Sequence, residues 1–313
     1  MTHPIHPALT TVIILSLCFT CNGFSQSKAK AKGMVKPSSA EPAPTYANLP
    51  YREGHPQTVL DFWKAEADEP TPLVIYLHGG GFSGGSKKIP PQQIRKFLAA
   101  GISVAGVEYR FIQDARLPAA HHDCRRALQF LRSKSAEWNL DPERIGAWGG
   151  SAGAQLCMYL AFHDEMADPE STDPIAREST RLHCISTNGG QATMDLEWFK
   201  KWIPEYEAPH RSTEKYFGEL TPEALGKTLS DLSALPLLSK DDPPLYMNYR
   251  MRPEDPVPDG PAAHGWKIHH VIFGVKLKEK MDALGLESYL NYPGKKSEKH
   301  PSFADFLIAK LRE

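Results

Sequence analysis

Residues 144–162 read RIGAWGGSAGAQLCMYLAF, an apolar stretch, a glycine-rich turn and a second, longer apolar stretch. The first part is typical of a buried strand and the last of a buried helix. The turn between them, GGSAG at 149–153, has the pattern G-x-S-x-G. This pattern predicts a strained strand-to-helix connection whose small neighbours let the Ser151 hydroxyl project from the sheet. The helix N-terminus behind it would offer backbone N–H groups to a developing negative charge.

A second glycine-rich stretch, HGGGF at 78–82, follows the apolar run LVIYL at 73–77. Three successive glycines let the backbone fold so that N–H groups point into a cavity without obstruction by side chains. The loop can therefore supply half of an oxyanion hole, with Gly80 and Gly81 as donors beside the N–H of Ala152. A phosphate-binding loop is disfavoured, because the chain has no G-x-x-x-x-G-K-[ST] pattern and no G-x-G-x-x-G after its first strand.

Strand-like and helix-like segments alternate around these two turns. The expected strands are 59–63, 73–77, 103–109, 145–148, 182–186, 245–249 and 288–292, and the expected helices are 92–100, 117–133, 152–163, 275–284 and 302–311. Such alternation predicts an α/β chain with a mainly parallel sheet and helices on both faces.

Residues 192–236 break the alternation. Helices are expected at 196–202 and 222–229, in a stretch rich in tryptophan and tyrosine. We expect a cap-like insertion over the carboxyl ends of the strands; the alternative is a peripheral subdomain without substrate contact.

The N-terminus predicts export. Residues 10–21 are apolar but too short to span a membrane, which takes about 20 residues. They fit the central region of a signal peptide at 1–25, cleaved after Ser25, and they indicate a secreted or periplasmic protein. An uncleaved anchor and a lipoprotein modified at Cys21 are the alternatives. Residues 26–45 are poor in large apolar side chains and predict a flexible linker, followed by one domain at 46–313.

Composition excludes several classes of protein. Lys and Arg number 36 against 37 Asp and Glu, which gives a net charge of −1. This balance disfavours a nucleic-acid partner, whose phosphates require a basic surface. A chain that is 41% hydrophobic overall is also neither a multi-span membrane protein nor mostly disordered, and no membrane span is expected after processing.

The cysteines and acidic residues predict neither disulfides nor a metal site. Cys124, Cys157 and Cys184 would remain after cleavage, an odd number at wide spacing that indicates small buried side chains. No C-x-x-C pair survives for zinc. The acidic cluster at 164–170 does not match the spacing of an EF-hand calcium loop.

The combination of HGGG at 78–81 with GGSAG at 149–153 resembles the α/β-hydrolase superfamily, in the branch of carboxylesterases and hormone-sensitive-lipase-like enzymes. The GGSAGA form is most similar to the subgroup of feruloyl and acetyl-xylan esterases, the BD-FAE-like proteins. The resemblance extends from about Tyr46 to the C-terminus, and it implies the α/β-hydrolase fold with a sheet of the eight-stranded type. Further similar stretches are EYR at 108–110, Asp123, DPERI at 141–145 and DDPP at 241–244.

The resemblance implies a catalytic triad in the chain order serine, acid, histidine. Ser151 is the expected nucleophile. Asp255 is the expected acid, because it follows the strand at 245–249, and Glu254 is the alternative because the loop is longer than usual.

The expected base is His300, which lies six residues after the stretch ESYLNYPG. The glycines that usually flank this histidine are missing from its surroundings, KKSEKHPSF. His269 and His270 are the alternatives, although they precede the last helix and strand.

The resemblance implies hydrolysis of carboxylic esters through an acyl-enzyme, without a metal or other cofactor, on short-acyl or polysaccharide-linked esters. Two alternatives stay open: a lipase or peptidase on the same scaffold, and a binding protein that keeps the fold without catalysis. Acyl group, alcohol and oligomeric state are left open by the sequence.

Overall fold

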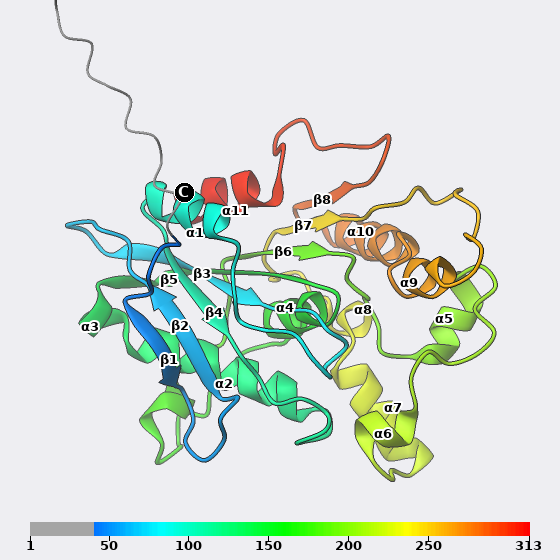
Figure 1. The fold of residues 1–313 in the computed structure, drawn as a ribbon, viewed down its shortest axis with the longest axis horizontal. Helices are drawn as coiled ribbons and strands as arrows, with labels where there is room; N and C mark the ends of the chain where they lie inside the picture. Colours follow the sequence, from blue (N-terminus) through cyan, green and yellow to red (C-terminus); the bar gives the residue numbers. More distant parts are fainter. Residues whose placement is uncertain (1–40) are drawn as a thin grey trace, which may run out of the picture. The chain divides into compact units, whose positions relative to one another are not determined.

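The computed structural model describes residues 41–313. The predicted signal peptide and residues 26–40 of the predicted linker lie outside this range. The described residues form one eight-stranded sheet in the order β1-β2-β4-β3-β5-β6-β7-β8 (Figure 1). The strands are β1 Tyr46–Pro50, β2 Val59–Trp63, β3 Thr71–Leu77, β4 Ser103–Val107, β5 Leu140–Gly150, β6 Cys184–Asn188, β7 Leu245–Asn248 and β8 Ser288–Asn291.

The sheet is mainly parallel, as the sequence predicts. The antiparallel pairs are β1 with β2 and β2 with β4, and β3 to β8 are all parallel. The extra strand that sequence patterning missed is β1, most of whose residues are exposed, so it lacks the buried run that marks the others.

Helices cover both faces of the sheet, and the expected helices are present with shifts of a few residues at their ends. The helical elements are α1 Pro91–Ala99, α2 Ala119–Ser133, α3 Ser135–Trp138, α4 Ala152–Phe162, η1 Pro174–Arg177, α5 Leu196–Trp202, α6 Thr213–Phe217, α7 Pro222–Asp231, α8 Ala234–Leu237, α9 Ala262–Ile268, α10 Ile272–Leu284 and α11 Phe303–Leu311.

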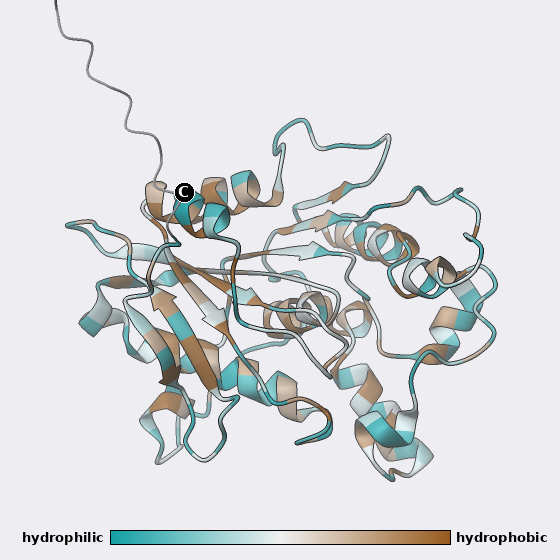
Figure 2. Ribbon diagram, in the orientation of Figure 1, coloured by the Kyte–Doolittle hydropathy of each residue, from teal (hydrophilic) through white to brown (hydrophobic). Residues whose placement is uncertain are grey.

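Two separate cores hold the layers together. Phe97 of α1 and Phe306 of α11 pack on one face of the sheet, while α2, α4 and α10 pack on the other. All residues of α4 are buried, which explains its continuous apolar sequence. Figure 2 shows the hydrophobic residues gathered along the central strands and the hydrophilic ones along the loops. Cys124, Cys157 and Cys184 are buried, as the sequence predicts, and each is a free thiol, a point that the sequence leaves open.

The insertion at 192–236 contains α5 to α8. The ring of Trp198 in α5 stacks on Phe273 of α10, with ring centroids 5.0 Å apart. The hydroxyl of Tyr216 in α6 donates a hydrogen bond to the Gly81 carbonyl, at 3.0 Å. The insertion therefore contacts the loop after β3 directly.

The end of the predicted linker, residues 41–45, has no regular structure but is attached to the domain. The Trp63 indole donates to the Pro42 carbonyl at 2.9 Å, and the Lys64 N–H donates to the Thr45 hydroxyl at 3.0 Å. Among residues 41–313, no helix is both long and apolar enough to cross a membrane.

The G-x-S-x-G turn and the loop after β3 approach so closely that some glycines cannot be replaced. A Cβ at Gly153 would lie 2.0 Å from the Leu77 carbonyl oxygen, and one at Gly149 would lie 2.5 Å from the same atom. Neither position can carry a side chain without separating β3 from the start of α4.

We predict that Gly153→Ala destabilises the protein by about 1–3 kcal/mol or prevents folding, because the added methyl overlaps main-chain atoms. The matched control is Gly226→Ala in α7, where a Cβ meets no atom within 4 Å. That control should stabilise the protein by up to about 1 kcal/mol, since alanine favours a helix interior. Urea unfolding of both variants is the measurement, and equal stabilities would contradict the packing described here.

Candidate active site

Ser151 occupies a strained turn between β5 and α4. Its backbone angles are φ 53° and ψ −120°, a region that residues other than glycine rarely adopt. The backbone N–H of Ser151 donates to the Asn188 carbonyl at 3.0 Å, which ties the turn to the end of β6. Strain held by surrounding structure is typical of functional residues, and here it presents a serine hydroxyl at the carboxyl edge of the sheet.

The Ser151 hydroxyl is paired with His269. The distance between Ser151 Oγ and His269 Nε2 is 2.9 Å, and His269 Nδ1 lies 2.9 Å from the Gly265 carbonyl oxygen. Because a carbonyl can only accept, the Nδ1 atom must carry the proton in this contact. The neutral ring then has a lone pair on Nε2, which can accept the proton of the serine hydroxyl.

His269 follows the last residue of α9, and its carbonyl partner lies one helical turn earlier. The ring also faces Gly189, where an added Cβ would lie 3.4 Å from the ring. Burial lowers the pKa of His269, and the hydrogen bond to the Gly265 carbonyl opposes this shift in part. The neutral imidazole, the form that can accept a proton, is therefore favoured near neutral pH.

The glycine loop after β3 lies beside Ser151. A Cβ at Gly79 would lie 2.7 Å from the Gly150 carbonyl oxygen and 3.5 Å from Ser151 Cβ. The backbone N–H groups of Gly80, Gly81 and Ala152 donate to no atom of residues 41–313. Unpaired N–H donors are what an oxyanion hole requires.

Hydrogen bonds from two parts of the chain hold this loop in place. After β4, Glu108 Oε1 lies 2.8 Å from His78 Nε2, and the Tyr109 hydroxyl donates to the His78 carbonyl at 2.7 Å. From the insertion, the Tyr216 hydroxyl of α6 donates to the Gly81 carbonyl. These contacts fix the glycines, whose own conformational freedom is large.

A cavity of about 570 Å³ opens onto Ser151 and His269. This is within the range of about 300–1,000 Å³ typical of small-molecule sites. Besides glycines, it is lined by Tyr76, Ser151, Asn188, Arg250, Met251, Pro258, Ala262, Trp266 and His269. The lining is therefore partly apolar, with the Arg250 side chain as its charged group.

His300 is not brought to Ser151, contrary to the expectation from chain order. It is 3% exposed and packs between Tyr289 and Phe306, with ring centroids 4.8 and 5.2 Å away. Its backbone N–H donates to the Ser297 hydroxyl. The connection from β8 to α11 turns back on itself here, because the Asn291 side chain accepts the Ser297 N–H at 2.6 Å. His300 therefore packs between β8 and α11, away from Ser151.

Asp255 is also not brought to His269. Its two carboxylate oxygens accept from the side chain and the backbone N–H of Arg252, both at 2.8 Å. These hydrogen bonds lower the pKa of Asp255, the backbone one most. The alternative acid, Glu254, lies 3.5 Å from the same guanidinium group. In the part of the chain that the structure describes, no carboxylate hydrogen-bonds to His269, and the Gly265 carbonyl takes that place.

Of the expected residues, Ser151 and Ala152 lie in one turn, and the loop that carries Gly80 and Gly81 meets this turn through Gly79. His269, one of the alternatives, is the histidine that contacts Ser151. The missing glycines around His300 and the long connection after β7 were the available signals for His269. No sequence signal pointed to the Gly265 carbonyl or to Tyr216. The first is a main-chain atom, and the second reaches the glycine loop only because of how the chain folds.

The chain belongs to the BD-FAE family. The model of this family matches residues 60–250, which is more than half of the chain. This assigns it to the α/β-hydrolase superfamily, as the two glycine motifs predict. The matched region includes both glycine motifs and ends before His269. The family match therefore does not itself identify the base.

Curated relatives share a shorter segment. A carboxylesterase of Mycobacterium tuberculosis is 33% identical over 101 residues, which is 32% of each chain. Tabersonine synthase of Catharanthus roseus is 31% identical over 108 residues, 28% of this chain and 34% of its own length. The chain thus matches about a third of the length of these relatives, and their names include both an esterase and a synthase.

Solved structures match over most of the chain. An acetyl ester-xyloside bifunctional hydrolase from Caldicellulosiruptor lactoaceticus has a TM-score of 0.60 at 22% identity, covering 82% of this chain and 87% of its own. A truncated carbohydrate esterase from gut microbiota has a TM-score of 0.65 at 18% identity, covering 86% and 96%. These similarities establish the fold.

We predict that His269 titrates below pH 6.5, because its burial disfavours the imidazolium form. Histidine-labelled protein should be followed by NMR from pH 4 to 9, with the His269 signals assigned by their loss in His269→Gln. A midpoint above 6.5 would instead indicate a nearby carboxylate that stabilises the charged ring.

Proposed function

We propose that the protein is a serine hydrolase of carboxylic esters that works with a Ser151–His269 pair. The observation that carries this proposal is the 2.9 Å contact between Ser151 Oγ and His269 Nε2, beside unpaired N–H groups. A hydroxyl is a weak nucleophile until a base accepts its proton, and the N–H donors stabilise the resulting oxyanion.

The proposed reaction begins when the ester carbonyl approaches Ser151 Oγ. His269 Nε2 takes the hydroxyl proton as Oγ bonds to the carbonyl carbon, and the oxyanion accepts hydrogen bonds from Gly80, Gly81 and Ala152. The imidazolium ion then gives its proton to the leaving alcohol oxygen, so that the alcohol departs and an acyl-enzyme remains.

Water completes the cycle in the proposed mechanism. His269 takes a proton from the water as its oxygen attacks the acyl carbon, and the proton returns to Ser151 Oγ when the acid leaves. Throughout, the Gly265 carbonyl holds Nδ1 and keeps Nε2 directed at the serine. A carbonyl compensates the transient positive charge less than a carboxylate would, because it carries only a partial charge. No step in this sequence needs a metal or other cofactor.

Esters with a short acyl group are the proposed substrates, by analogy with the structurally similar acetyl ester-xyloside hydrolase. The cavity beside Ser151 is partly apolar and carries one charged side chain, Arg250. A lipase or peptidase on the same scaffold remains an alternative and is separated by assays with long-chain esters and peptides. A binding protein without catalysis is disfavoured, because the serine, its histidine and the unpaired donors lie in one arrangement.

We predict that His269→Ala lowers kcat/KM for a short-chain aryl ester by about a thousandfold or more, as loss of a general base does in serine hydrolases. Ser151→Ala should lose at least as much. His300→Gln and Asp255→Asn should stay within about threefold of the parent, because neither side chain reaches the serine or His269.

The thermal unfolding of all four variants serves as the control, since His300 is buried and its replacement also affects packing. If Ser151→Ala retained turnover, the serine mechanism would be wrong. A large loss in Asp255→Asn with normal stability would show that the acid acts in catalysis after all.

We further predict that Tyr216→Phe lowers kcat about tenfold with little change in KM, because the Gly81 peptide loses the hydrogen bond that orients the loop. The matched control is Tyr206→Phe in the same insertion, whose hydroxyl contacts His210 instead of the loop. Steady-state kinetics of both variants would decide the point, and equal values of kcat would exclude a positioning role for Tyr216.

A further inference from the structure

Two buried glutamines connect the helix that begins after Ser151 with the peptide bond in front of His269. Gln155 lies in the first turn of α4, and its side-chain amide donates to the Gln191 side-chain oxygen at 2.7 Å. The Gln191 amide in turn donates to the Ile268 carbonyl at 2.7 Å. Ile268 is the last residue of α9 and directly precedes His269. The two hydrogen bonds therefore form a chain from the helix of the nucleophile to the main chain of the proposed base.

The last acceptor fixes the direction of this chain. The Ile268 carbonyl can only accept, so the Gln191 group that faces it is the NH₂ group, and the Gln191 oxygen then faces Gln155. That oxygen needs a donor, which is the NH₂ group of Gln155. The Gln155 oxygen is left buried without a partner in the part of the chain that the structure describes. Both amides thus have one orientation, set by the peptide before the base.

Packing alone does not account for the pair. The side chains of Gln155 and Gln191 are 4% and 5% exposed. A buried amide loses its hydrogen bonds to water, and the Gln155 oxygen gains none in return. Leucine, with a similar volume, would fill either position without this loss. Leucine cannot hold the Ile268 carbonyl, so the amides indicate that this carbonyl must be held in one direction.

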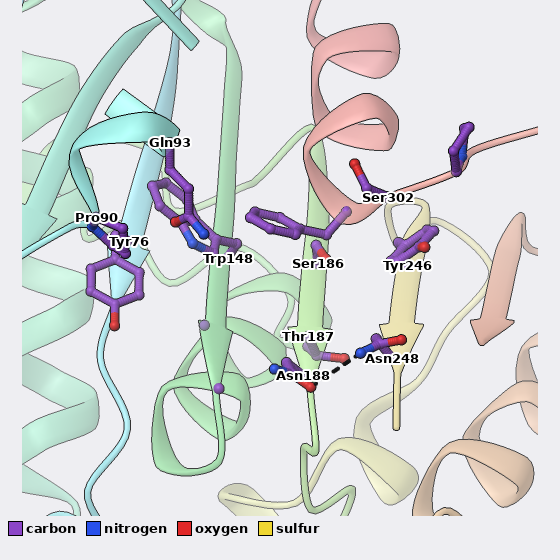
Figure 3. Close-up of a pocket in the computed structure, with 14 residues that line it drawn as sticks. Tyr76, Pro90, Gln93, Trp148, Ser186, Thr187, Asn188, Tyr246, Asn248 and Ser302 are labelled. Atoms are coloured by element: carbon purple, nitrogen blue, oxygen red, sulfur yellow. Dashed lines mark hydrogen bonds between the residues drawn. The ribbon is translucent and has the colours of Figure 1, made fainter. Parts of the chain in front are cut away.

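The segment 188–191, which carries the second glutamine, begins at the nucleophile. The Asn188 carbonyl at the end of β6 accepts the Ser151 N–H at 3.0 Å. Figure 3 shows the Asn188 side chain directed towards Asn248 of β7, whose amide donates to it at 3.4 Å. The start of the segment is therefore fixed between the turn that carries the serine and the end of β7.

The same segment ends at the base. Gly189 faces the His269 ring, from which an added Cβ would lie 3.4 Å away. The Gly190 carbonyl accepts the buried Tyr249 hydroxyl at 2.6 Å. Gln191 then reaches the carbonyl before the base. Four consecutive residues thus contact the serine backbone, the histidine ring and the peptide in front of it, and they place the two side chains relative to each other.

The helix α9 needs such a contact, because little else holds it. None of its residues is buried. A helix of seven residues is marginal on its own and depends on packing. Within residues 41–313, its other hydrogen bond to a distant part of the chain is exposed and runs from the Lys267 ammonium group to the Glu205 carbonyl at 2.8 Å. The Gly265 carbonyl that orients the His269 ring belongs to this helix, so a displaced α9 would carry the ring with it.

We propose that Gln191, oriented by Gln155, is a positioning residue for His269. It holds the peptide before the base and thereby keeps Nε2 directed at the Ser151 hydroxyl. The Gly265 carbonyl holds the ring, and Gln191 holds the helix to which that carbonyl belongs. This role deepens the ester hydrolysis proposed above and rests on it.

The test replaces Gln191 by leucine, which has a similar volume and donates no hydrogen bond. Gln191→Leu should lower kcat for a short-chain aryl ester about ten- to a hundredfold and leave KM within about twofold, because a base displaced by about 1 Å loses rate but not binding. The matched control is Gln129→Leu in α2. Gln129 is also 4% exposed, and its amide donates to the carbonyls of Ala176 and Glu178 of the η1 region. This control should lose stability similarly and keep kcat within about twofold of the parent.

The double variant Gln155→Leu/Gln191→Leu separates positioning from stability. Two apolar side chains leave no amide unpaired, so urea unfolding should show a stability closer to that of the parent than Gln191→Leu has. Its kcat should stay as low as in Gln191→Leu, because the Ile268 carbonyl is still not held. If kcat recovered together with stability, the glutamines would be structural only and the positioning role would be overturned.

A coupling measurement connects the effect to the base. In a His269→Ala background, adding Gln191→Leu should change kcat/KM by less than about twofold, since the glutamine acts through the histidine. An undiminished loss in this background would overturn the proposal. So would a kcat of Gln191→Leu within about twofold of the parent, or a rise in KM alone, which would indicate contact with the substrate.

Two further results have a defined meaning. If Gln191→Leu does not fold, Gln155→Leu takes its place, since it removes the support of Gln191, and it should lower kcat at least about threefold; an unchanged kcat would overturn the proposal. If the parent hydrolyses no ester, or His269→Ala is as active as the parent, the proposed function itself fails. An active parent that depends on His269 but not on Gln191 would overturn the positioning role alone.

Discussion

The site depends on main-chain atoms from two parts of the sheet lying in contact. At Gly79, Gly149 and Gly153, any Cβ would fall within 2.7 Å of a backbone oxygen. Only glycine allows β3, the turn at Ser151 and the first turn of α4 to meet so closely. The same contact accompanies the positive φ of Ser151 and holds the glycine loop after β3 against the turn that carries this serine.

The histidine that completes the site reaches it by an unexpected route. It comes from the connection between β7 and β8, where α9 places the Gly265 carbonyl behind the ring. A carbonyl fixes the tautomer as firmly as a carboxylate does, but it contributes less to stabilising a charged ring. Burial acts in the same direction by lowering the pKa of His269. The arrangement thus favours the neutral form of the His269 ring, as the proposed role of a general base requires.

The fold and half of the site could be predicted from the sequence, for a physical reason. Buried parallel strands and the glycine turns must carry particular residues, so patterns such as 73–82 and 144–162 mark them directly. The exposed strand β1 has no such constraint and was missed. The histidine could not be placed by chain order, because the paths of two long connections decide which one reaches Ser151. Hydrogen bonds of Asn291 and of Arg252 shape those two connections, and no pattern in the sequence indicates these bonds.

The most direct test of the Ser151–His269 pair is the rate at which an organophosphonate labels the protein, followed by mass spectrometry of its peptides. We expect one phosphonyl group per chain, on the peptide that contains Ser151, with labelling strongly slowed in His269→Ala and unchanged in His300→Gln. Rapid labelling of Ser151 without His269, or slow labelling only without His300, would contradict this expectation.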